Sequence, residues 1–390
     1  MQISLSQIFR YFLYLGIAGF GGPLAIIEYI RQELVQEKKW MTAEEFKSYL
    51  GYSQIAPGPL AYQVALYFSY FKRGVWAAVL AGIGLVLPSY LIVLLFSIFY
   101  KEFRDINYIS WALYGISPTV IAIILYSGIN LSRTIFHKDI FQYVLFFSAI
   151  TVSVLFKIHI ILLILLFAIV SLLYYTVQRL TKEKKLFSIS LFSAGGFLLM
   201  VNNIYGLMLN VLNSAGSKLT DIMYVFMKAG GLTYGSGFVI IGVLRQDVVT
   251  NYGWLTAKEF LDGIAFGQIT PGPVVITSTF IGYMVSGVWG SLIATVSVFL
   301  PTFILVMIIS RIIEKIKDNF YLKSALTGAN AASIGAIITT GYFLSLDAIT
   351  DYWSLGIFLV TAAVLFALKT KQYYLIALGA VAGILIKAIF

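Results

Sequence analysis

Long apolar segments recur along the whole chain, separated by short polar connections. Most are close to the roughly 18 to 20 residues that a helix needs to cross a hydrocarbon core about 30 Å thick. The pattern predicts an all-α polytopic membrane protein with about 13 transmembrane helices. The predicted segments are 8–30, 60–71, 75–100, 108–130, 140–156, 158–178, 187–212, 221–243, 263–285, 287–310, 321–345, 353–368 and 372–389.

Two pairs of motifs interrupt these segments. The first pair is rich in glycine, Phe20-Gly21-Gly22-Pro23 and Tyr234-Gly235-Ser236-Gly237. The second pair is Gln54-Ile55-Ala56-Pro57-Gly58-Pro59 and Gln268-Ile269-Thr270-Pro271-Gly272-Pro273. Proline fits the first position of a helix, so a helix can begin at each Pro-Gly-Pro run. Irregular backbone at membrane depth is tolerated only where protein covers it or where it lines a cavity, so the motifs indicate a site.

The two halves of the chain repeat each other. Adding 214 takes Gly16 to Gly230, and the same offset superposes the two Gln/Pro-Gly-Pro phrases. After a one-residue deletion, adding 213 takes Pro88 to Pro301. We therefore expect a first repeat at 1–180, a linker with one extra span at 181–218, and a second repeat at 219–390.

The number of spans predicts how the repeats are oriented. Six spans, one extra span and six more would place the second repeat upside down relative to the first, an architecture typical of secondary transporters. Loops on the side of the N-terminus would carry about twice as many Lys and Arg residues as those on the other side. This count places Arg31, Lys38, Lys39 and Lys47 on the opposite side of the membrane from Arg10. The positive-inside rule then predicts a plasma-membrane protein with a cytoplasmic N-terminus and an external C-terminus.

Composition narrows the function further. The net charge of +10 would suggest nucleic acid in a soluble protein, but here the basic residues lie in short loops next to the lipid bilayer, so no nucleic-acid partner is expected. The chain has no cysteine and only two histidines, which argues against disulfides and against transport of soft metal cations. No nucleophile–base pair, carboxylate cluster or phosphate loop is present. We expect no catalysis and no cofactor.

The interrupted motifs offer donors for an anion. A helix that begins at Gly21 and Gly22, or at the equivalent Tyr234, Gly235, Ser236 and Gly237, points backbone amides and a partial positive charge at a ligand. Close helix packing through small residues is the alternative. The predicted ligand-binding residues of the Gln/Pro-Gly-Pro phrases are Gln54, Pro57, Gly58, Pro59, Gln268, Thr270, Pro271, Gly272 and Pro273. A structural kink is the alternative there.

Charged residues near the membrane are further candidates. Lys228 lies several residues into its apolar segment, where an ammonium group is costly unless it is paired or binds a substrate. It is a candidate anion ligand, or a lysine that reaches to the interface. Arg31 and Arg245 occupy equivalent places, as do Glu45 and Glu259. These four could gate or couple transport, with a structural role favoured for the acids.

These motifs resemble the chromate ion transporter family in its long-chain, two-domain form. The resemblance covers nearly the whole chain. It rests on Phe20-Gly21-Gly22-Pro23, on Trp40, Glu45 and Phe46, on Pro57-Gly58-Pro59 with its second copy, on the stretches 262–268 and 279–283, and on Phe299-Leu300-Pro301. Two departures are Ser236, where the family often has glycine, and Lys72-Arg73, which interrupt the end of the second segment.

The resemblance implies export of chromate from the cytoplasm, with resistance to chromate as the consequence. Chromate is a tetrahedral oxyanion, so the donors named above suit it in charge and chemistry. Sulfate has the same shape and charge, and a carrier or channel for sulfate or another oxyanion remains the alternative. A lipid-modifying enzyme would need paired catalytic groups near one interface, and a cation transporter several intramembrane carboxylates. The oligomeric state stays open, with a homodimer as one option.

Overall fold

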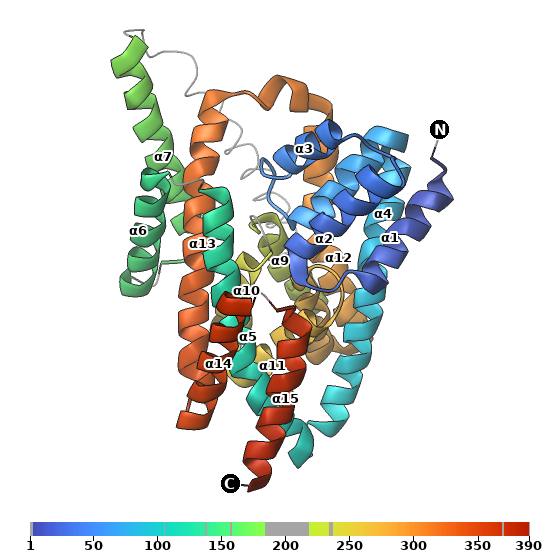
Figure 1. Cartoon of the computed structure of the whole chain (residues 1–390), viewed down its shortest axis with the longest axis vertical. Helices are drawn as coiled ribbons and strands as arrows, with labels where there is room; N and C mark the ends of the chain where they lie inside the picture. Colours follow the sequence, from blue (N-terminus) through green and yellow to red (C-terminus); the bar gives the residue numbers. More distant parts are fainter. Residues whose placement is uncertain are drawn as a thin grey trace.

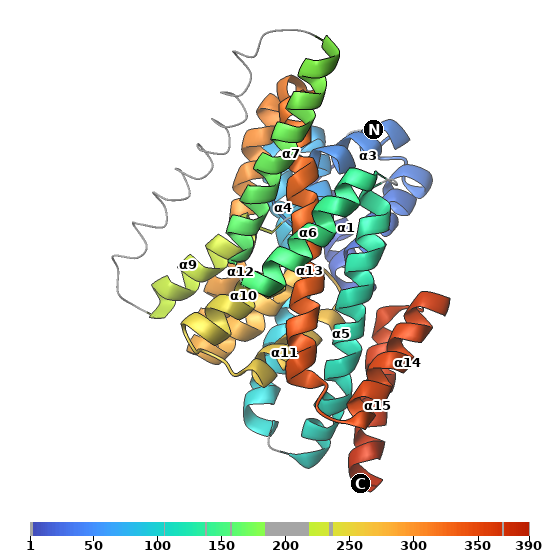
Figure 2. The ribbon, with the colours of Figure 1, turned by 90° about the vertical axis from the view of Figure 1, so that its left-hand side faces the viewer.

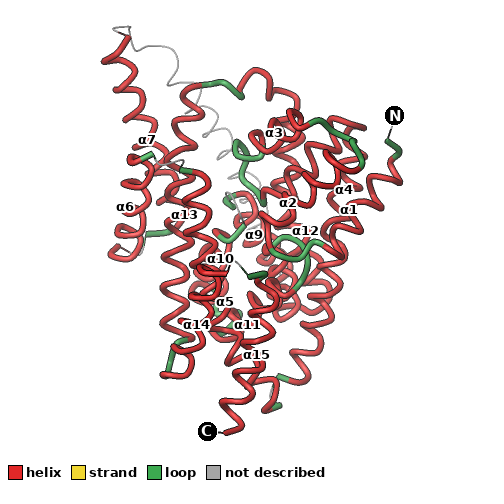
Figure 3. Tube along the Cα trace, viewed as in Figure 1, coloured by secondary structure: helices red, strands yellow, loops and turns green. Residues whose placement is uncertain are grey.

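The structure is a computed structural model that describes residues 3–104, 106–136, 139–156, 158–183, 218–233, 237–368 and 370–389. The described elements are helical throughout, which confirms the all-α class (Figure 3). The extra span predicted at 187–212 lies outside the described residues. The helices are α1 (Leu5–Ala18), α2 (Gly22–Ile30), η1 (Arg31–Glu37), α3 (Ala43–Tyr52), α4 (Leu60–Phe103), α5 (Asn107–Ile135), α6 (Ile140–Phe156), α7 (Ile160–Glu183), α9 (Lys218–Gly231), α10 (Val239–Arg245), η2 (Gln246–Asn251), α11 (Ala257–Ile269), η3 (Val274–Ile276), α12 (Thr277–Ile316), α13 (Phe320–Ala348), α14 (Tyr352–Leu368) and α15 (Gln372–Ile389).

Six of the described helical stretches are long and apolar enough to cross a membrane, so the chain is a multi-pass membrane protein. They belong to α4, α5, α7, α12, α13 and α15, the stretch in α12 including η3. The helices α6 and α14 are apolar but shorter. Several of the other predicted segments are divided into two helices, and the second helix folds back along the first.

The two longest helices each contain a reversal. A straight helix of the 44 residues of α4 would be about 66 Å long, roughly twice the hydrocarbon core. Instead, the backbone leaves helical geometry at Arg73 and Gly74, where the sequence predicted a break. Ser286 and Gly287 do the same in α12. The hydroxyls of Thr279 and Thr295, which lie on the two sides of this break in the sequence, are 2.7 Å apart. Each long helix is therefore a tight hairpin.

The leading segment of the first half also folds back. The ring of Tyr11 in α1 lies 5.9 Å from the ring of Trp40, which follows η1. The ammonium group of Lys38 lies 5.9 Å from the same tyrosine ring. The reversal occurs at Gly21 and Gly22, whose φ angles of 114° and 79° are left-handed. The sequence-based prediction that Lys38 and its neighbours lie on the other side of the membrane from the N-terminus is therefore wrong. The leading segment folds back, so these residues lie beside α1.

The second half repeats this geometry. The ammonium group of Lys228, in the last turn of α9, lies 2.6 Å from a carboxylate oxygen of Asp247 in η2, so the leading segment again folds back along its first helix. The predicted tip of this hairpin, Tyr234, Gly235 and Ser236, lies outside the described residues.

Each Pro-Gly-Pro run forms the tip of a further hairpin. In the first half, the ring of Tyr49 in α3 stacks on Phe71 at 5.4 Å, and Tyr52 contacts Tyr67 at 5.8 Å. In the second half, Phe266 in α11 contacts Phe280 in α12 at 5.5 Å.

The two halves interlock. Helices α6 and α7 of the first half pack on α13 of the second, and α14 and α15 pack on α5 of the first (Figure 2). Gly115 and Gly328, which the repeat makes equivalent, allow these contacts, because a Cβ atom would clash with the backbone of Gly379 and Phe167 respectively. Each half thus completes its core with the last hairpin of the other.

The N- and C-termini lie at opposite ends of the longest axis (Figure 1). We call the end that carries α3 and the turn at 317–319 the N-terminal face. The end that carries the last residues of α4 and the turn at 349–351 is the C-terminal face.

Candidate functional site

The Pro-Gly-Pro turns meet the glycine-rich breaks of the opposite half. The amide of Gly58 donates to the carbonyl oxygen of Thr233, and the amide of Gly272 donates to that of Gly19 at 3.2 Å. The offset of 214 relates Gly58 to Gly272 and Gly19 to Thr233, so the two hydrogen bonds are equivalent. The structure therefore brings together the motifs that the sequence singled out, and it does so reciprocally between the halves.

The glycine of each turn is required by its backbone and by its neighbours. Gly58 has φ 143° and Gly272 has φ 112°, a region that residues with a Cβ atom rarely adopt. A Cβ atom would also clash with Thr302 at Gly58 and with Ser89 at Gly272. The hydroxyl of Ser89 donates to the carbonyl oxygen of Pro271. Sequence reasoning missed Ser89 and Thr302, although they follow the aligned prolines Pro88 and Pro301 and are themselves related by 213.

The two predicted glutamines have different surroundings. Gln54 is exposed and lines a cavity, whereas Gln268 is only 8% exposed. The Nε2 group of Gln268 has no acceptor among the described residues. An unpaired buried polar group costs about 1–3 kcal/mol, so this amide is available to a ligand or to another conformation. The hydroxyl of Thr270 donates to the carbonyl oxygen of Gly267 at 3.1 Å and has a local partner.

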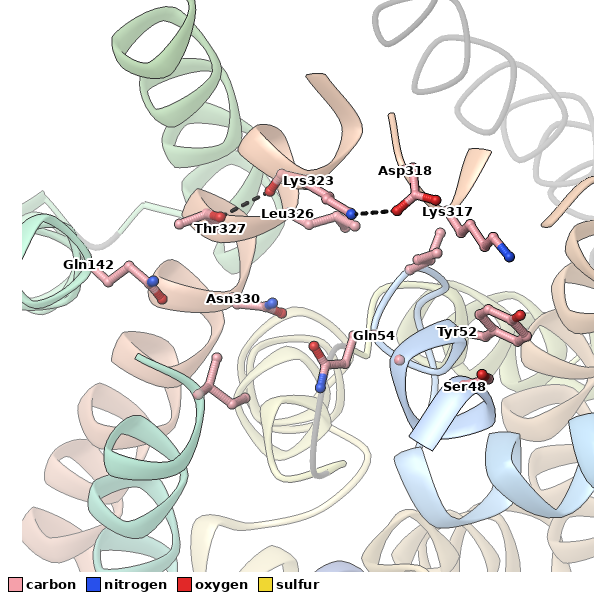
Figure 4. Close-up of a pocket in the computed structure, with 13 residues that line it drawn as sticks. Ser48, Tyr52, Gln54, Gln142, Lys317, Asp318, Lys323, Leu326, Thr327 and Asn330 are labelled. Carbon is pink, nitrogen blue, oxygen red and sulfur yellow. Dashed lines mark hydrogen bonds and ion pairs between the residues drawn. The ribbon is translucent and has the colours of Figure 1, made fainter. Parts of the chain in front are cut away.

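The cavity beside Gln54 has a volume of about 480 Å³ and opens at the N-terminal face (Figure 4). Gln54 and Asn330 lie on opposite walls, and both side chains face the space between them (Figure 4). The cations at its rim have acidic partners, since Lys323 pairs with Asp318 at 2.9 Å and Lys317 pairs with Glu314 at 2.5 Å. The lining residues are Ser48, Gly51, Tyr52, Gln54, Ile55, Ile135, Gln142, Lys317, Asp318, Lys323, Leu326, Thr327 and Asn330.

The chemistry of this cavity suits an anion. Its deeper walls carry neutral amide and hydroxyl groups, which can donate hydrogen bonds without a fixed charge. At its rim the charges of Lys317 and Lys323 are balanced by Glu314 and Asp318, so the neutral donors are what make the cavity suitable for an anion. Gln142, Thr327 and Asn330 lie outside the two pairs of motifs, because they come from helices that only the tertiary structure brings beside the first turn.

Residues of the second half that are equivalent to residues lining this cavity lie at the C-terminal face, and several of them are buried. Gly51 is exposed and its equivalent Ala265 is buried, and Ser48 is half-buried where Asp262 is 1% exposed. The ring of Tyr100 covers this region, with its centroid 5.7 Å from that of Phe266. The cavity is thus open toward one face of the molecule, and its counterpart is closed at the other.

Lys228 has a partner that the sequence analysis did not identify. Its side chain is 13% exposed and pairs with Asp247, whose side chain is 2% exposed. Asn251 donates a further hydrogen bond of 2.9 Å to this carboxylate. A buried charge that loses its partner is strongly destabilising, so the pair holds the hairpin of α9 and η2 together. Binding of an anion by Lys228 remains a prediction and would have to compete with Asp247.

The four predicted gating residues all form ion pairs. Arg31 pairs with Glu28, Arg245 with Asp347, Glu45 with Lys72 and Glu259 with Arg104. Both glutamates also complete capping boxes, with Thr42 at the start of α3 and Thr256 at the start of α11.

The acid at the C-terminal face illustrates the balance of forces on these carboxylates. Burial raises the pKa of Glu259, but hydrogen bonds from Thr256 and Arg104 outweigh burial, and the pKa lies below its ordinary value. The geometry therefore gives both acids a structural role, and a role in gating remains a prediction.

Comparison with known sequences finds one matching family and several relatives that align over nearly the whole chain. It matches the chromate transporter family over residues 6–172 and 220–384. It is 32% identical to a probable chromate transport protein of Synechococcus elongatus, covering 98% of this chain and 95% of the relative. It is 33% identical to a chromate transport protein of Cupriavidus metallidurans, with 97% and 92% covered. No solved structure matches the chain.

A third relative matches over almost the same length. The chain is 31% identical to an uncharacterized transporter of Methanocaldococcus jannaschii, with 98% of this chain and 94% of the relative covered. Because the family matches both halves, and full-length relatives align over nearly the whole chain, this multi-pass membrane protein belongs to the chromate transporter family, a family of transporters and not of enzymes.

Proposed function

We propose that the protein is a secondary transporter that exports chromate from the cytoplasm by alternating access and so gives resistance to chromate. The two halves would act as inverted repeats that rock around the reciprocal contacts between Gly58 and Thr233 and between Gly272 and Gly19. Helix breaks that face each other between inverted repeats are a recurring transporter architecture.

One observation carries this proposal. Equivalent positions of the two halves differ in exposure, with Gln54 open to a cavity and Gln268 buried. In an alternating-access carrier built from repeats, each half adopts in turn the arrangement that its counterpart has in the other state. The difference between Gln54 and Gln268 is what a single state of such a carrier would present.

The charge distribution supports a cytoplasmic N-terminal face. Because the leading segment folds back, Lys38, Lys39 and Lys47 lie at the same end as the N-terminus, together with Lys317 and Lys323. This increases the excess of basic residues at that end and favours N-terminus inside and C-terminus outside. The open cavity would then load its anion from the cytoplasm, as export requires.

Chromate is the substrate that we favour because relatives that align over nearly the full length carry that name. Sulfate is the second candidate, since the amide and hydroxyl groups of the cavity recognise an oxyanion by shape and charge alone. Flux of labelled chromate into proteoliposomes, with sulfate as competitor, separates the two. Chromate flux that excess sulfate leaves unchanged supports a chromate carrier, whereas sulfate flux without chromate flux contradicts it.

The same assay tests the proposed ligands. We expect Gln54→Ala and Gln268→Ala each to lower chromate flux by about tenfold or more, the effect of losing one or two charge-assisted hydrogen bonds. Lys228→Ala tests its predicted ligand role in parallel. Unchanged flux in all three variants would overturn the site assignment. Mass measurement of the purified protein in detergent tests whether it forms a homodimer.

A further inference from the structure

Asp262 is a buried carboxyl group that the proposed transport site does not use. It lies in α11, two turns before Gln268, and is 1% exposed. Its Oδ2 atom accepts a hydrogen bond of 2.9 Å from the hydroxyl of Tyr100 in α4. Its Oδ1 atom is buried without a donor among the described residues. A carboxylate in such a place is costly, and a protonated carboxyl group is far less so.

The repeat shows what surrounds Asp262 when its face is open. Its equivalent in the first half is Ser48, which lines the open cavity at the N-terminal face. Tyr52 and Gln54 line the same cavity, and their equivalents are Phe266 and Gln268. When the C-terminal face opens by the same movement, Asp262 would line the second cavity and be in contact with water. The first half has a serine at this position, so of the two equivalent positions only the one at the C-terminal face carries an acid.

Tyr100 joins Asp262 to the aromatic cover of the closed face. Its ring lies 5.1 Å from that of Phe280 and 5.7 Å from that of Phe266. One turn nearer the end of the molecule, Arg104 pairs with Glu259. The charged and titratable groups that act on Asp262 are therefore Tyr100 and Arg104 of α4, and Lys258 and Glu259 of α11. The contact with the carboxyl group that carries the argument is the hydrogen bond from the neutral hydroxyl of Tyr100.

We propose that Asp262 is a proton-binding gating residue, which holds the C-terminal face closed when protonated and favours its opening when ionised. This rests on the proposed function, because it assigns a role within alternating access. The closed state buries the carboxyl group and the open state hydrates it, so the closed state binds the proton more tightly. By linkage, a rise in pH at the C-terminal face shifts the equilibrium toward the open state.

The absence of native cysteine makes the gate directly measurable. Ala265→Cys reports on the closed face and Gly51→Cys on the open one, since the two positions are equivalent. The ratio of their labelling rates with a water-soluble maleimide, measured on detergent-solubilised protein in which both faces are accessible, reduces the effect of pH on the thiol chemistry itself. We expect this ratio to rise about tenfold or more between about pH 5 and about pH 8, as one shifted proton-binding equilibrium allows.

Asp262→Asn keeps the shape and the acceptor but cannot ionise. In this variant we expect the ratio to stay low and flat over the same pH range. Tyr100→Phe removes a donor that favours the ionised form, so the midpoint moves to higher pH. A tyrosine that only fills space would leave the midpoint unchanged. Asp262→Ser introduces the residue that the first half has at the equivalent position, and it should likewise give a flat ratio. This second variant controls for an effect specific to asparagine.

Asp351→Asn is the matched control. Asp351 also accepts a tyrosine hydroxyl, that of Tyr114 at 2.5 Å, and also lies at the C-terminal face, but in the turn before α14. This variant should keep the wild-type pH response. A wild-type response in Asp262→Asn and Asp262→Ser overturns the inference. Chromate flux is measured separately, so absent flux with an intact pH response would reject the proposed substrate and leave the gate standing.

Discussion

At the scale of single residues, the centre of the molecule depends on two glycines and their neighbours. Gly58 and Gly272 each combine a left-handed backbone with a side chain pressed against the α position, Thr302 in one case and Ser89 in the other. The proline on either side stiffens the same turn. The turn can therefore present its amide to the opposite half with little loss of conformational freedom.

Substitution of either glycine should abolish the reciprocal contact. We expect Gly58→Ala and Gly272→Ala to reduce transport about tenfold or more, because a strained φ angle costs about 1–3 kcal/mol before any steric clash is counted. Gly356→Ala in α14 is the control, since a Cβ atom there meets no other atom within 4 Å. Anion flux at matched protein levels is the measurement, and equal flux in the turn variants and the control would contradict the prediction.

Variants of the buried ion pair of Lys228 and Asp247 can separate the structural role of Lys228 from its predicted role as an anion ligand. Lys228→Met leaves a buried carboxylate unpaired and should lower stability by about 3–5 kcal/mol. Lys228→Met with Asp247→Asn should recover most of that loss, as thermal unfolding in detergent would show. If Lys228 also binds the anion, the double variant folds but does not transport. Full transport in the double variant would show that the lysine is structural only.

At the scale of elements, the helices around the centre are hairpins and not simple spans. Left-handed glycines turn α1 into α2, and the breaks at Gly74 and Gly287 turn each long helix back on itself. Backbone groups freed at such turns must be covered by protein in a membrane. The contacts between the halves provide that cover, as the amides of Gly58 and Gly272 illustrate.

The hairpins predict which residues share a side of the membrane. We expect Lys39→Cys to react with an impermeant thiol reagent from the cytoplasmic side, because the segment returns beside Tyr11. Thr250→Cys in η2, at the corresponding turn of the second half, should react only from outside if the repeats are inverted. Labelling of both from one side would contradict the inverted arrangement, and labelling of Lys39→Cys from outside would restore the simple-span topology.

At the scale of the whole molecule, the two repeats are not independent domains. Helices α6 and α7 find their packing partner in α13, and α14 and α15 find theirs in α5. The glycines at these crossings allow backbones to approach closely, which is how helices associate in lipid. If the halves move during transport as proposed, each would carry the last hairpin of the other with it.

Interlocking predicts that neither half is stable alone. Two fragments divided within residues 184–217 should each be degraded when expressed separately, because each leaves a long helix without its partner hairpin. Expression of both fragments together should restore protein and transport, measured by membrane abundance and anion flux. A stable, folded first fragment on its own would show that the crossed hairpins contribute little to folding.

The sequence by itself determined the helical class, the repeat and the positions of the breaks. Apolar length predicts helices in lipid, and glycine and proline mark breaks locally, so Gly21, Gly58 and Gly272 could be identified without a structure. The pairing of the two motifs followed from the constant offset between the halves. These features depend on residues close together in the chain or on the comparison of one half with the other.

Only the tertiary structure decided where the chain goes after each break and which partners it meets. A change of a few backbone angles at Gly21 and Gly22 converts a span into a hairpin, and apolar periodicity is blind to that choice. The partner of Lys228 and the covering of Asp262 come from helices far apart in sequence. Gln54 and Gln268 have the same local motif but opposite exposure, because exposure depends on the packing of the entire molecule in one state.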